Sequence, residues 1–515
     1  MKRYYITTTL PYVNADPHIG FALEIIQADV LARYHKLLGE EVIFNTGTDE
    51  HGLKIYRKAE ELNKTPQEYC DEYADKFNNL KKALNLSYEN FIRTTDEKHI
   101  KAVQEFWKLC KKNGDIYKKK YKVKYCVGCE LEKTDSELVD GKCPIHPNLD
   151  LELIDEENYF FKFSKYQKAL LDLYKKNPDF VIPENRQNEI KAFVERGLED
   201  FSISRLKTKM PWGIDVPDDK DQVMYVWFDA LVNYISTLDW PENKENFEKF
   251  WPGIQIAGKD NLRQQTAMWQ AMLLSAGLPN SEQVFIHGFI TSEGQKMSKS
   301  LGNVINPYEI VEKYGVDAVR YYLLGALPAY EDGDFSISRF EEYYTAHLVN
   351  GIGNLTFRIL TMLEKYSDSK IPKISGSVIG NLKEEFFGFW HNDFGDGKGE
   401  IGLYRNSFAN YNFSEAIRVI NIFIKKIDQF ISDSEPWKKV KAGEDISGLL
   451  YYLAESLRQI AIALLPIIPE TAEKILDQLN YKIEKDFAEE IEWAKLKEGT
   501  EIKKGEILFP RLDKN

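Results

Sequence analysis

The chain has 515 residues, of which 43% are hydrophobic and 29% charged, and its formal net charge at pH 7 is −13. Domains of about 100–200 residues predict three or four modules, each with a core of its own. The net charge excludes a surface uniformly coated in positive charge for nucleic acid. It leaves room for a local basic face, because phosphate binding depends on where the cations lie. The lysine run between Lys118 and Lys124 is one candidate, and a solvated edge explains it equally well.

Neither the N-terminus nor the cysteines indicate export, and no apolar stretch is long enough to span a membrane. The N-terminus enters a strand-like run at once, without the pattern of a signal peptide. The most apolar stretch, residues 460–468, is too short to cross a bilayer and contains Pro466. Cys70 and Cys110 stand alone, and the other three cysteines cluster with a histidine, which is metal spacing rather than a disulfide framework. We therefore expect a soluble, cytoplasmic protein with no membrane partner.

The first part of the chain has the pattern of a nucleotide-binding α/β sheet. Residues Tyr4–Leu10 are aromatic and β-branched, as in a buried strand. Asp16, followed by a proline, predicts a capped helix start, and helical periodicity runs over Ile19–Leu38. Glu41–Asn45 predicts the next strand. A strand, a helix and a strand within about 40 residues form a βαβ unit, which indicates a doubly wound parallel, Rossmann-like sheet.

This sheet is predicted to be split by an insertion and followed by a helical bundle. Later strands at Ile254–Ala257 and Val284–His287 would complete the sheet. Between Asn412 and Ser432, isoleucines at steps of three and four are typical of a helix with one buried face, which indicates the bundle. We expect the first half of the sheet domain over residues 1–114, a connective insertion over 115–225, the second half over 226–325, a connecting segment over 326–345 and an α-helical domain over 346–515.

Two short motifs fall one in each half of the predicted sheet. Residues 17–20 (Pro-His-Ile-Gly) lie at the start of the first helix, where free N–H groups favour phosphate. His18 can donate to a phosphoryl oxygen there, and Gly20 lets a base approach the backbone. Residues 296–300 (Lys-Met-Ser-Lys-Ser) place two lysines on a loop that can stabilise charge during nucleotidyl transfer. Each motif alone is more typical of a plain helix cap or an exposed loop.

As a pair, the motifs resemble the signatures of class I aminoacyl-tRNA synthetases. Segments 8–14, 46–52, 226–230 and 287–289 resemble the methionyl-tRNA synthetases in particular, with a bacterial-type single zinc knuckle, and the resemblance covers nearly the whole chain. It implies a methionine–tRNA ligase that forms methionyl-adenylate from ATP and methionine, with Mg²⁺ accompanying ATP. Transfer to the 3′-terminal adenosine of initiator and elongator tRNA(Met) would follow, releasing AMP. Phe21 departs from the family, which usually has a second histidine there.

The resemblance also assigns residues to the reaction. The catalytic set would be His18, Lys296 and Lys299. The ATP-binding set would be His18, Gly20, Glu24, Gly258, Asp260, Lys296 and Lys299. The methionine-binding set would be Leu10, Tyr12, Asp49, Trp227, Ala230, Tyr234, Asn261 and Gln265, with Trp269 as a further candidate. A carboxylate can pair with the substrate ammonium, and aromatic rings hold a thioether well. Core packing would be the simpler interpretation of the aromatic residues taken singly. The family usually has isoleucine and histidine at positions 261 and 265, so we expect a more polar pocket wall here.

The insertion carries a candidate metal site. Cys126-x-x-Cys129 is followed, after thirteen residues, by Cys143-x-x-His146. Four such ligands suit tetrahedral Zn²⁺ and leave no open coordination position, so we expect one structural zinc ion per chain. Free thiols beside an incidental histidine are the alternative.

The helical bundle would bind the anticodon. The resemblance places Asn354, Arg358 and Trp437 there, and the first two lie one turn apart on one helical face. An exposed tryptophan can stack on an unpaired base. An ordinary solvated face and a helix-end packing residue are the alternatives. Many relatives continue into a further tRNA-binding domain that dimerises, so we expect a monomer. The segment over 326–345 would make the stem contact beside the lysine motif.

Two other hypotheses compete with this one. A class I enzyme for another bulky apolar amino acid is disfavoured by the short insertion. A non-catalytic RNA-binding paralogue is disfavoured by the two nucleotide motifs, which RNA binding alone does not need.

Overall fold

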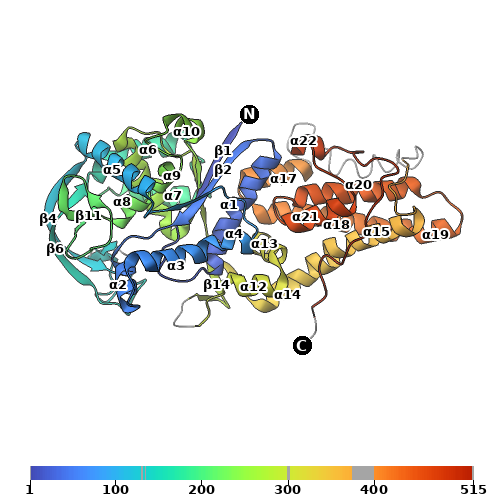
Figure 1. Cartoon of the computed structure of the whole chain (residues 1–515), viewed down its shortest axis with the longest axis horizontal. Coiled ribbons are helices and arrows are strands. Elements are labelled where there is room, and N and C mark those ends of the chain that lie inside the picture. The colour runs from blue at the N-terminus through green and yellow to red at the C-terminus, as the bar shows by residue number, and fades with distance from the viewer. Residues whose placement is uncertain (1, 129–130, 134, 298–301, 374–399, 513–515) are drawn as a thin grey trace.

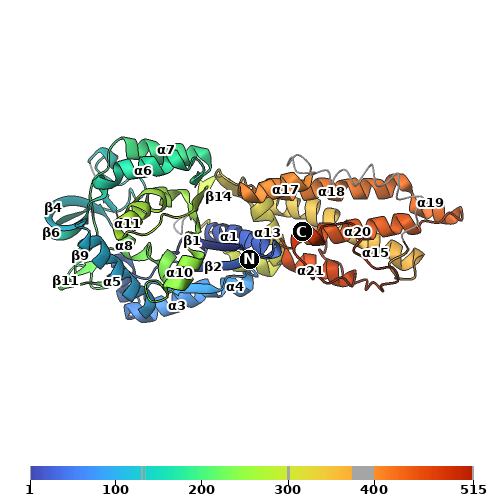
Figure 2. The same ribbon diagram turned by 90° about the horizontal axis from the view of Figure 1, so that it is seen from above.

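The computed structural model describes residues 2–128, 131–133, 135–297, 302–373 and 400–512. The molecule is elongated, with an α/β body at one end and a helical bundle extending from it (Figures 1 and 2). Within the described residues, no helix combines the length and the apolar character that crossing a membrane requires.

A six-stranded sheet forms the centre of the α/β body, in the order β3-β2-β1-β12-β13-β7. Its strands are β1 (Arg3–Thr8), β2 (Glu41–Thr48), β3 (Asn90–Arg93), β7 (Val181–Ile182), β12 (Ile254–Gly258) and β13 (Gln283–His287). Every neighbouring pair is parallel. The two halves of the chain meet where β1 pairs with β12, which is the point at which such sheets bind ligands. The predicted doubly wound parallel sheet is confirmed.

Helices bury both faces of this sheet. Tyr4 and Ile6 of β1 point into one core and Tyr5 into the other, as expected of a strand covered on both sides. The first core contains α1 (Ile19–Leu37), α3 (Pro66–Asn78) and α13 (Val316–Gly325), and it continues into the helical bundle. The second contains α5 (Glu97–Lys112) and α11 (Trp269–Ala276). Shorter helices at the periphery are α2 (Leu53–Glu61), α4 (Leu80–Ala83) and α10 (Lys244–Phe250).

The start of α1 differs from the expectation. The N-cap is His18, whose side chain accepts the Gly20 N–H, and not Asp16. The Asp16 carboxylate instead pairs with Lys76, 3.0 Å away on α3. The physical reason is that two residues, one a proline, separate Asp16 from the first helical turn, so its carboxylate does not reach the free N–H groups.

The insertion is built on an antiparallel ribbon of β4 (Ile116–Cys126) and β6 (Glu152–Phe161), flanked by β5 (Leu131–Lys133) and β8 (Phe201–Ser202). The helices α6 (Gln167–Lys176) and α7 (Glu184–Glu195) follow, and β7 between them adds to the edge of the central sheet. A small second sheet contains β9 (Ser204–Leu206), β10 (Asp215–Val216) and β11 (Asp219–Met224). The insertion therefore contributes a strand to the central sheet, because β7 pairs with β13.

The lysine run lies along β4, where acidic side chains neutralise much of it. Lys118 pairs with Asp219 at 2.6 Å, Lys122 with Asp155 at 2.9 Å and Lys124 with Asp135 at 2.8 Å. Because these charges are compensated within the protein, the arrangement favours the solvated edge over a phosphate-binding face.

The second half of the chain supplies the bundle. Its helices are α12 (Pro307–Tyr314), α14 (Ile337–Tyr343), α15 (Asn354–Tyr366), α17 (Glu400–Ala409), α18 (Phe413–Ser434), α19 (Pro436–Lys441), α20 (Ser447–Leu464), α21 (Pro469–Gln478) and α22 (Phe487–Glu490). A π-helix, Tyr344–Gly353, joins α14 to α15. The predicted isoleucines of α18 are buried, and α18 ends where Glu435 adopts a positive φ of 45° before a proline.

Arg320 on α13 joins body and bundle. Its guanidinium is fully buried and donates to Asp29 of α1 at 2.7 Å, to Leu84 O at 3.0 Å and to Ile467 O at 2.8 Å. These acceptors belong to the α/β body on one side and to the turn before α21 on the other. A buried charge with this many partners fixes the two parts against each other.

Candidate active site

One cavity of about 730 Å³ opens beside the carboxyl ends of β1, β2 and β12. This volume lies in the range of small-molecule sites. Apart from Trp269 and the two lysines, its lining includes every residue predicted for methionine or ATP: Leu10, Tyr12, His18, Gly20, Glu24, Asp49, Trp227, Ala230, Tyr234, Gly258, Asp260, Asn261 and Gln265. Residues from both halves of the chain therefore meet around one space, although their individual roles stay predictions.

His18 presents a hydrogen-bond donor at the start of α1. Its Nδ1 accepts the Gly20 N–H at 3.1 Å, so the neutral imidazole carries its proton on Nε2. Loss of hydration among the surrounding residues lowers the pKa of His18, which favours this neutral form. A Cβ at Gly20 would lie 2.9 Å from His18 Cε1, so only glycine leaves the ring in this place. A donor and a helix N-terminus together suit a phosphoryl oxygen.

Glu24 is buried and connects β1, α1 and β13. It accepts the Thr9 N–H at 2.8 Å and contacts His287 Nε2 at 3.0 Å, while His287 Nδ1 lies 2.8 Å from Gly288 O. Burial alone would lower the pKa of His287, but the hydrogen bond and charge of Glu24 outweigh it and raise that pKa. An imidazolium satisfies both acceptors. His287 is absent from the predicted site residues, although it ends a predicted strand and belongs to a segment that resembles the family.

Tyr12 and Asp49 follow β1 and β2 and are joined through their backbones. Asp49 N donates to Pro11 O at 3.0 Å, and Val13 N donates to Asp49 O at 3.2 Å. The Asp49 side chain is buried at the cavity, and the Tyr12 hydroxyl donates to His51 O at 2.8 Å. A buried carboxylate at this place suits an ammonium group.

The aromatic wall comes from two short helices, α8 (Val226–Ala230) with Trp227, and α9 (Asn233–Ser236) with Tyr234. Fully buried Asp229 anchors α8, with His51 Nδ1 at 2.6 Å and His99 Nε2 at 2.8 Å. Burial by itself raises the pKa of Asp229, but the two imidazoles outweigh it and hold that pKa below its usual range. The sequence does not reveal this support, because His51 and His99 are 178 and 130 residues away from Asp229.

The polar wall predicted at Asn261 and Gln265 lines the cavity. Gln265 is buried in a π-helix (Gln264–Met268), and its Nε2 donates to the Tyr234 hydroxyl at 2.7 Å. Trp269 does not line the cavity, and its assignment to the pocket is wrong. Its ring is fully buried, stacks on Phe106 at 5.5 Å and lies 5.9 Å behind Tyr234, because the helix turns it into the second core.

The second motif approaches the first. The backbone of Lys296 belongs to β15 (Gln295–Lys296), which pairs with β14 (Ile290–Ser292), and β14 also pairs with β16 (Gly333–Phe335). Met297 lines the cavity, and its Cε would lie 3.8 Å from a Cβ at Gly20. Lys299 and the side chain of Lys296 lie outside the described residues.

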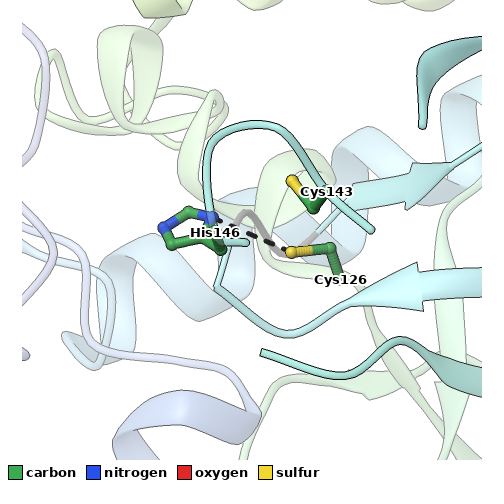
Figure 3. A group of neighbouring side chains, drawn as sticks. All are labelled: Cys126, Cys143 and His146. Carbon is green, nitrogen blue, oxygen red and sulfur yellow. Dashed lines mark hydrogen bonds between the residues drawn. The ribbon is translucent and has the colours of Figure 1, made fainter. Parts of the chain in front are cut away.

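A candidate metal centre lies in the insertion (Figure 3). The ligand atoms of Cys126, Cys143 and His146 lie within 4.8 Å of one another, and Cys126 Sγ is 3.8 Å from His146 Nδ1. Bond lengths to zinc of about 2.0–2.3 Å separate tetrahedral ligands by about 3.5–3.8 Å. The three residues therefore fit Zn²⁺, while Cys129 lies outside the described residues. A Cβ at Gly128 would come 2.6 Å from the His146 ring, so the turn needs glycine. Gly128 also lines the active-site cavity.

The predicted anticodon residues lie in the bundle. Asn354 is exposed at the start of α15, and Trp437 on α19 is 38% exposed, which is unusual for this side chain. Arg358 pairs with Asp428, near the end of α18 from which α19 follows. Both views place α19 at the tip of the bundle, away from the α/β body (Figures 1 and 2).

Comparison with known families defines the class. The family model "tRNA synthetases class I (M)" matches residues 4–152 and 147–360, and the model "Anticodon-binding domain of tRNA ligase" matches residues 401–509. The chain thus combines a class I synthetase domain with an anticodon-binding domain.

Individual relatives narrow the class. Methionine–tRNA ligase of Thermosynechococcus vestitus is 44% identical over 93% of this chain and 90% of its own length. The methionine–tRNA ligase of Thermotoga maritima is 42% identical over 99% of this chain and 80% of its own length. The structure of Mycobacterium tuberculosis methionyl-tRNA synthetase in complex with methionyl-adenylate has a TM-score of 0.92, at 35% identity over 99% of this chain and 100% of that one. The chain belongs to the methionyl-tRNA synthetase family, the ATP-dependent methionine–tRNA ligases.

Proposed function

We propose that the chain activates methionine with ATP in the 730 Å³ cavity and passes the methionyl group to tRNA(Met). The observation that carries the proposal is the convergence of the helix start at His18 and the buried Asp49 on this one space. The methionine carboxylate attacks the α-phosphorus of ATP, and pyrophosphate leaves. A hydroxyl of the tRNA's terminal adenosine then attacks the carbonyl of methionyl-adenylate, and AMP leaves.

Charge on the reacting phosphate is stabilised by fixed donors. His18 donates through Nε2, because Nδ1 is occupied by the Gly20 N–H. Lys296 and Lys299 provide positive charge from the second motif, and Gly20, Gly258 and Asp260 bind the nucleotide. Mg²⁺ bound with ATP would neutralise part of the triphosphate charge. Catalysis rests on positioning and electrostatics, with no covalent enzyme intermediate.

Methionine is held at both of its ends. Asp49 binds the ammonium group, and Leu10, Trp227 and Ala230 surround the side chain together with Tyr12 and Tyr234. In the second step, Trp437, Asn354 and the guanidinium group of Arg358 contact the anticodon of initiator and elongator tRNA(Met).

The proposal includes a structural zinc ion held by Cys126, Cys129, Cys143 and His146. A Cys143→Ser variant should contain about one zinc ion less per chain than the parent and should unfold at lower temperature. Cys70→Ser is the matched control, since Cys70 is equally buried but stands outside the cluster. Equal zinc content in the parent and the Cys143→Ser variant would refute this site.

ATP–pyrophosphate exchange with each of the twenty amino acids, without tRNA, tests the activation step. Exchange driven by methionine alone is the expected result. Exchange driven by another amino acid would contradict the pocket assignment. No exchange with any amino acid would contradict tRNA-independent activation. Charging of a tRNA(Met) transcript then tests the second step.

A further inference from the structure

Three consecutive buried residues after β2, Asp49, Glu50 and His51, turn their side chains in different directions. Of the three, Asp49 alone lines the active-site cavity. The His51 ring contacts a carboxylate of α8, and the Glu50 carboxylate contacts Arg93 at the end of β3. Glu50 also accepts a hydrogen bond of 2.6 Å from Thr48, two residues earlier. In an extended segment, side chains two residues apart share a face, so Glu50 and Asp49 lie on opposite faces.

The Glu50 carboxylate is fully buried and accepts hydrogen bonds on both of its oxygens. Oε1 lies 2.6 Å from the Thr48 hydroxyl and 2.6 Å from Arg93 Nε. Oε2 lies 2.9 Å from Arg93 Nη2 and 2.5 Å from Thr95 Oγ1. Two N–H groups of one guanidinium on one carboxylate form a bidentate pair, which adds geometric specificity to the attraction. The four residues Thr48, Glu50, Arg93 and Thr95 are called the Glu50 clamp below.

The backbone around Glu50 is fixed as well. Its N–H donates to Thr94 Oγ1 at 2.9 Å, and its carbonyl accepts the indole N–H of Trp212 at 2.6 Å. Trp212 belongs to the insertion, and its own carbonyl accepts the Gly52 N–H at 3.1 Å. On the other side, the backbone N–H and carbonyl of Asp49 are bonded to the segment after β1. The Cα–Cβ bond of Asp49 therefore keeps one direction, toward the cavity, unless several buried hydrogen bonds break.

Stability alone does not explain the Glu50 clamp. A buried ion pair is often no more stabilising than apolar side chains of the same volume, so its value here lies in what it holds in place. The pair also cancels charge at the residue next to Asp49. Because Glu50 neutralises Arg93, the guanidinium does not repel a cation that approaches Asp49. Arg93 is held from a second side by Asp71 of α3, at 2.6 Å.

We propose that Glu50 is a positioning residue for the amino group of the substrate: through the Glu50 clamp it fixes the direction of the Asp49 carboxylate and cancels the positive charge beside it. A charge-assisted hydrogen bond to an ammonium group requires its acceptor in a defined place, and side chains locked by surrounding hydrogen bonds provide that place. Glu50 itself does not touch the substrate. This inference rests on the proposed function, in which Asp49 binds the methionine ammonium.

Glu50→Gln tests the proposal, because the two side chains have similar size and the change lies outside the cavity lining. The glutamine Nε2 would oppose an N–H of Arg93, donor to donor, and the guanidinium would lose its buried counter-charge. We expect the KM for methionine in ATP–pyrophosphate exchange to rise about tenfold, the value of one charge-assisted hydrogen bond. The KM for ATP should stay at the parent value, since the nucleotide does not contact Asp49.

The α-hydroxy acid analogue of methionine, in which a hydroxyl group replaces the amino group, separates positioning from general damage. It keeps the carboxylate and the thioether but has no ammonium group. Its inhibition constant against methionine should therefore change less than about twofold in Glu50→Gln. If Glu50→Gln does not fold, Thr95→Val takes its place, because it removes one hydrogen bond of the Glu50 clamp and keeps both charges. Thr95→Val should raise the methionine KM about threefold, with the inhibition constant again unchanged.

Glu455→Gln is the matched control. Glu455 is equally buried and contacts Arg458 Nη2 at 2.5 Å and Nε at 3.0 Å, but it lies on α20 in the bundle. This variant should unfold at a lower temperature, as Glu50→Gln should, and keep the methionine KM of the parent. An unchanged methionine KM in the folded clamp variant, or an inhibition constant of the hydroxy acid that rises by the same factor, would overturn the proposal. Absence of methionine-driven exchange in the parent would instead refute the proposed function.

Discussion

The active-site cavity and the tip of the bundle hold their side chains in different ways. Around the cavity, Asp49, Glu24 and Asp229 are buried, and the last two have several short hydrogen bonds. At the tip, Trp437 is 38% exposed and Arg358 has an ion pair with Asp428. A site that must stabilise developing charge requires fixed dipoles, whereas a site that stacks on a flexible loop of RNA requires accessible surface.

This difference means that the two regions can be tested separately. Substitutions in the cavity should change amino-acid activation even without tRNA. Substitutions at the tip should change only tRNA charging. A tip variant that altered pyrophosphate exchange would show that the two regions are coupled, and Arg320, which contacts both the body and the bundle, would be the connection to examine.

The largest expected effect is at His18. Removing the imidazole in His18→Ala should lower kcat for pyrophosphate exchange by about 100-fold, because one preorganised donor to the phosphoryl oxygen is lost. Steady-state exchange kinetics at saturating ATP and methionine measure it. Glu72→Gln on α3 is the control and should stay within about twofold of the parent, because Glu72 lies outside the cavity lining and its exposed pair with Lys64 contributes little. A His18→Ala protein as active as the parent would exclude a catalytic role.

A smaller effect, confined to the second step, is expected at Trp437. Trp437→Ala should lower kcat/KM for tRNA(Met) about tenfold or more, since base stacking contributes about 1–3 kcal/mol. Pyrophosphate exchange without tRNA should be unchanged. Trp437→Phe keeps an aromatic face and should recover most of the loss. If Trp437→Ala charged tRNA(Met) as efficiently as the parent, Trp437 would be a packing residue with no role in anticodon binding.

At Arg358 the expected loss is smaller again. Arg358→Ala should lower kcat/KM for tRNA(Met) about threefold, because part of the guanidinium charge is already neutralised by Asp428. Asp428→Asn removes that competition and should raise kcat/KM above the parent value. If both variants weakened charging equally, the ion pair itself, rather than a free arginine, would be what tRNA binding needs.

The smallest effect concerns stability and pH. The pKa of His287 is raised by Glu24, so their pair stabilises the fold fully below the unfolded-state pKa of about 6.5 and loses this contribution as pH rises through the folded-state pKa. The difference in urea midpoint between the parent and His287→Asn should therefore be largest near pH 6 and shrink toward pH 9. A difference that grows with pH would contradict the charged pair.

The sequence by itself predicted those features that depend on residues close together in the chain. The strand and helix periodicities predicted the parallel sheet, and the two motifs with the family segments pointed to the residues that line the cavity. The cysteine spacing likewise indicated the cluster of Cys126, Cys143 and His146. Such patterns are visible in a sequence because the period of an element and the spacing of a short motif are properties of neighbouring residues.

Only the tertiary structure decided which distant side chains meet. The pairs Glu24–His287 and His51–Asp229 join residues 263 and 178 positions apart. The hydrogen bonds among Gln270, Ser281 and Gln255 likewise connect α11, the loop before β13 and the strand β12. The tertiary structure also shows that Trp269 is buried in the core and that His18, instead of Asp16, is the N-cap of α1. The direction of a side chain depends on the packing around it, and that packing is a property of the assembled chain rather than of any segment.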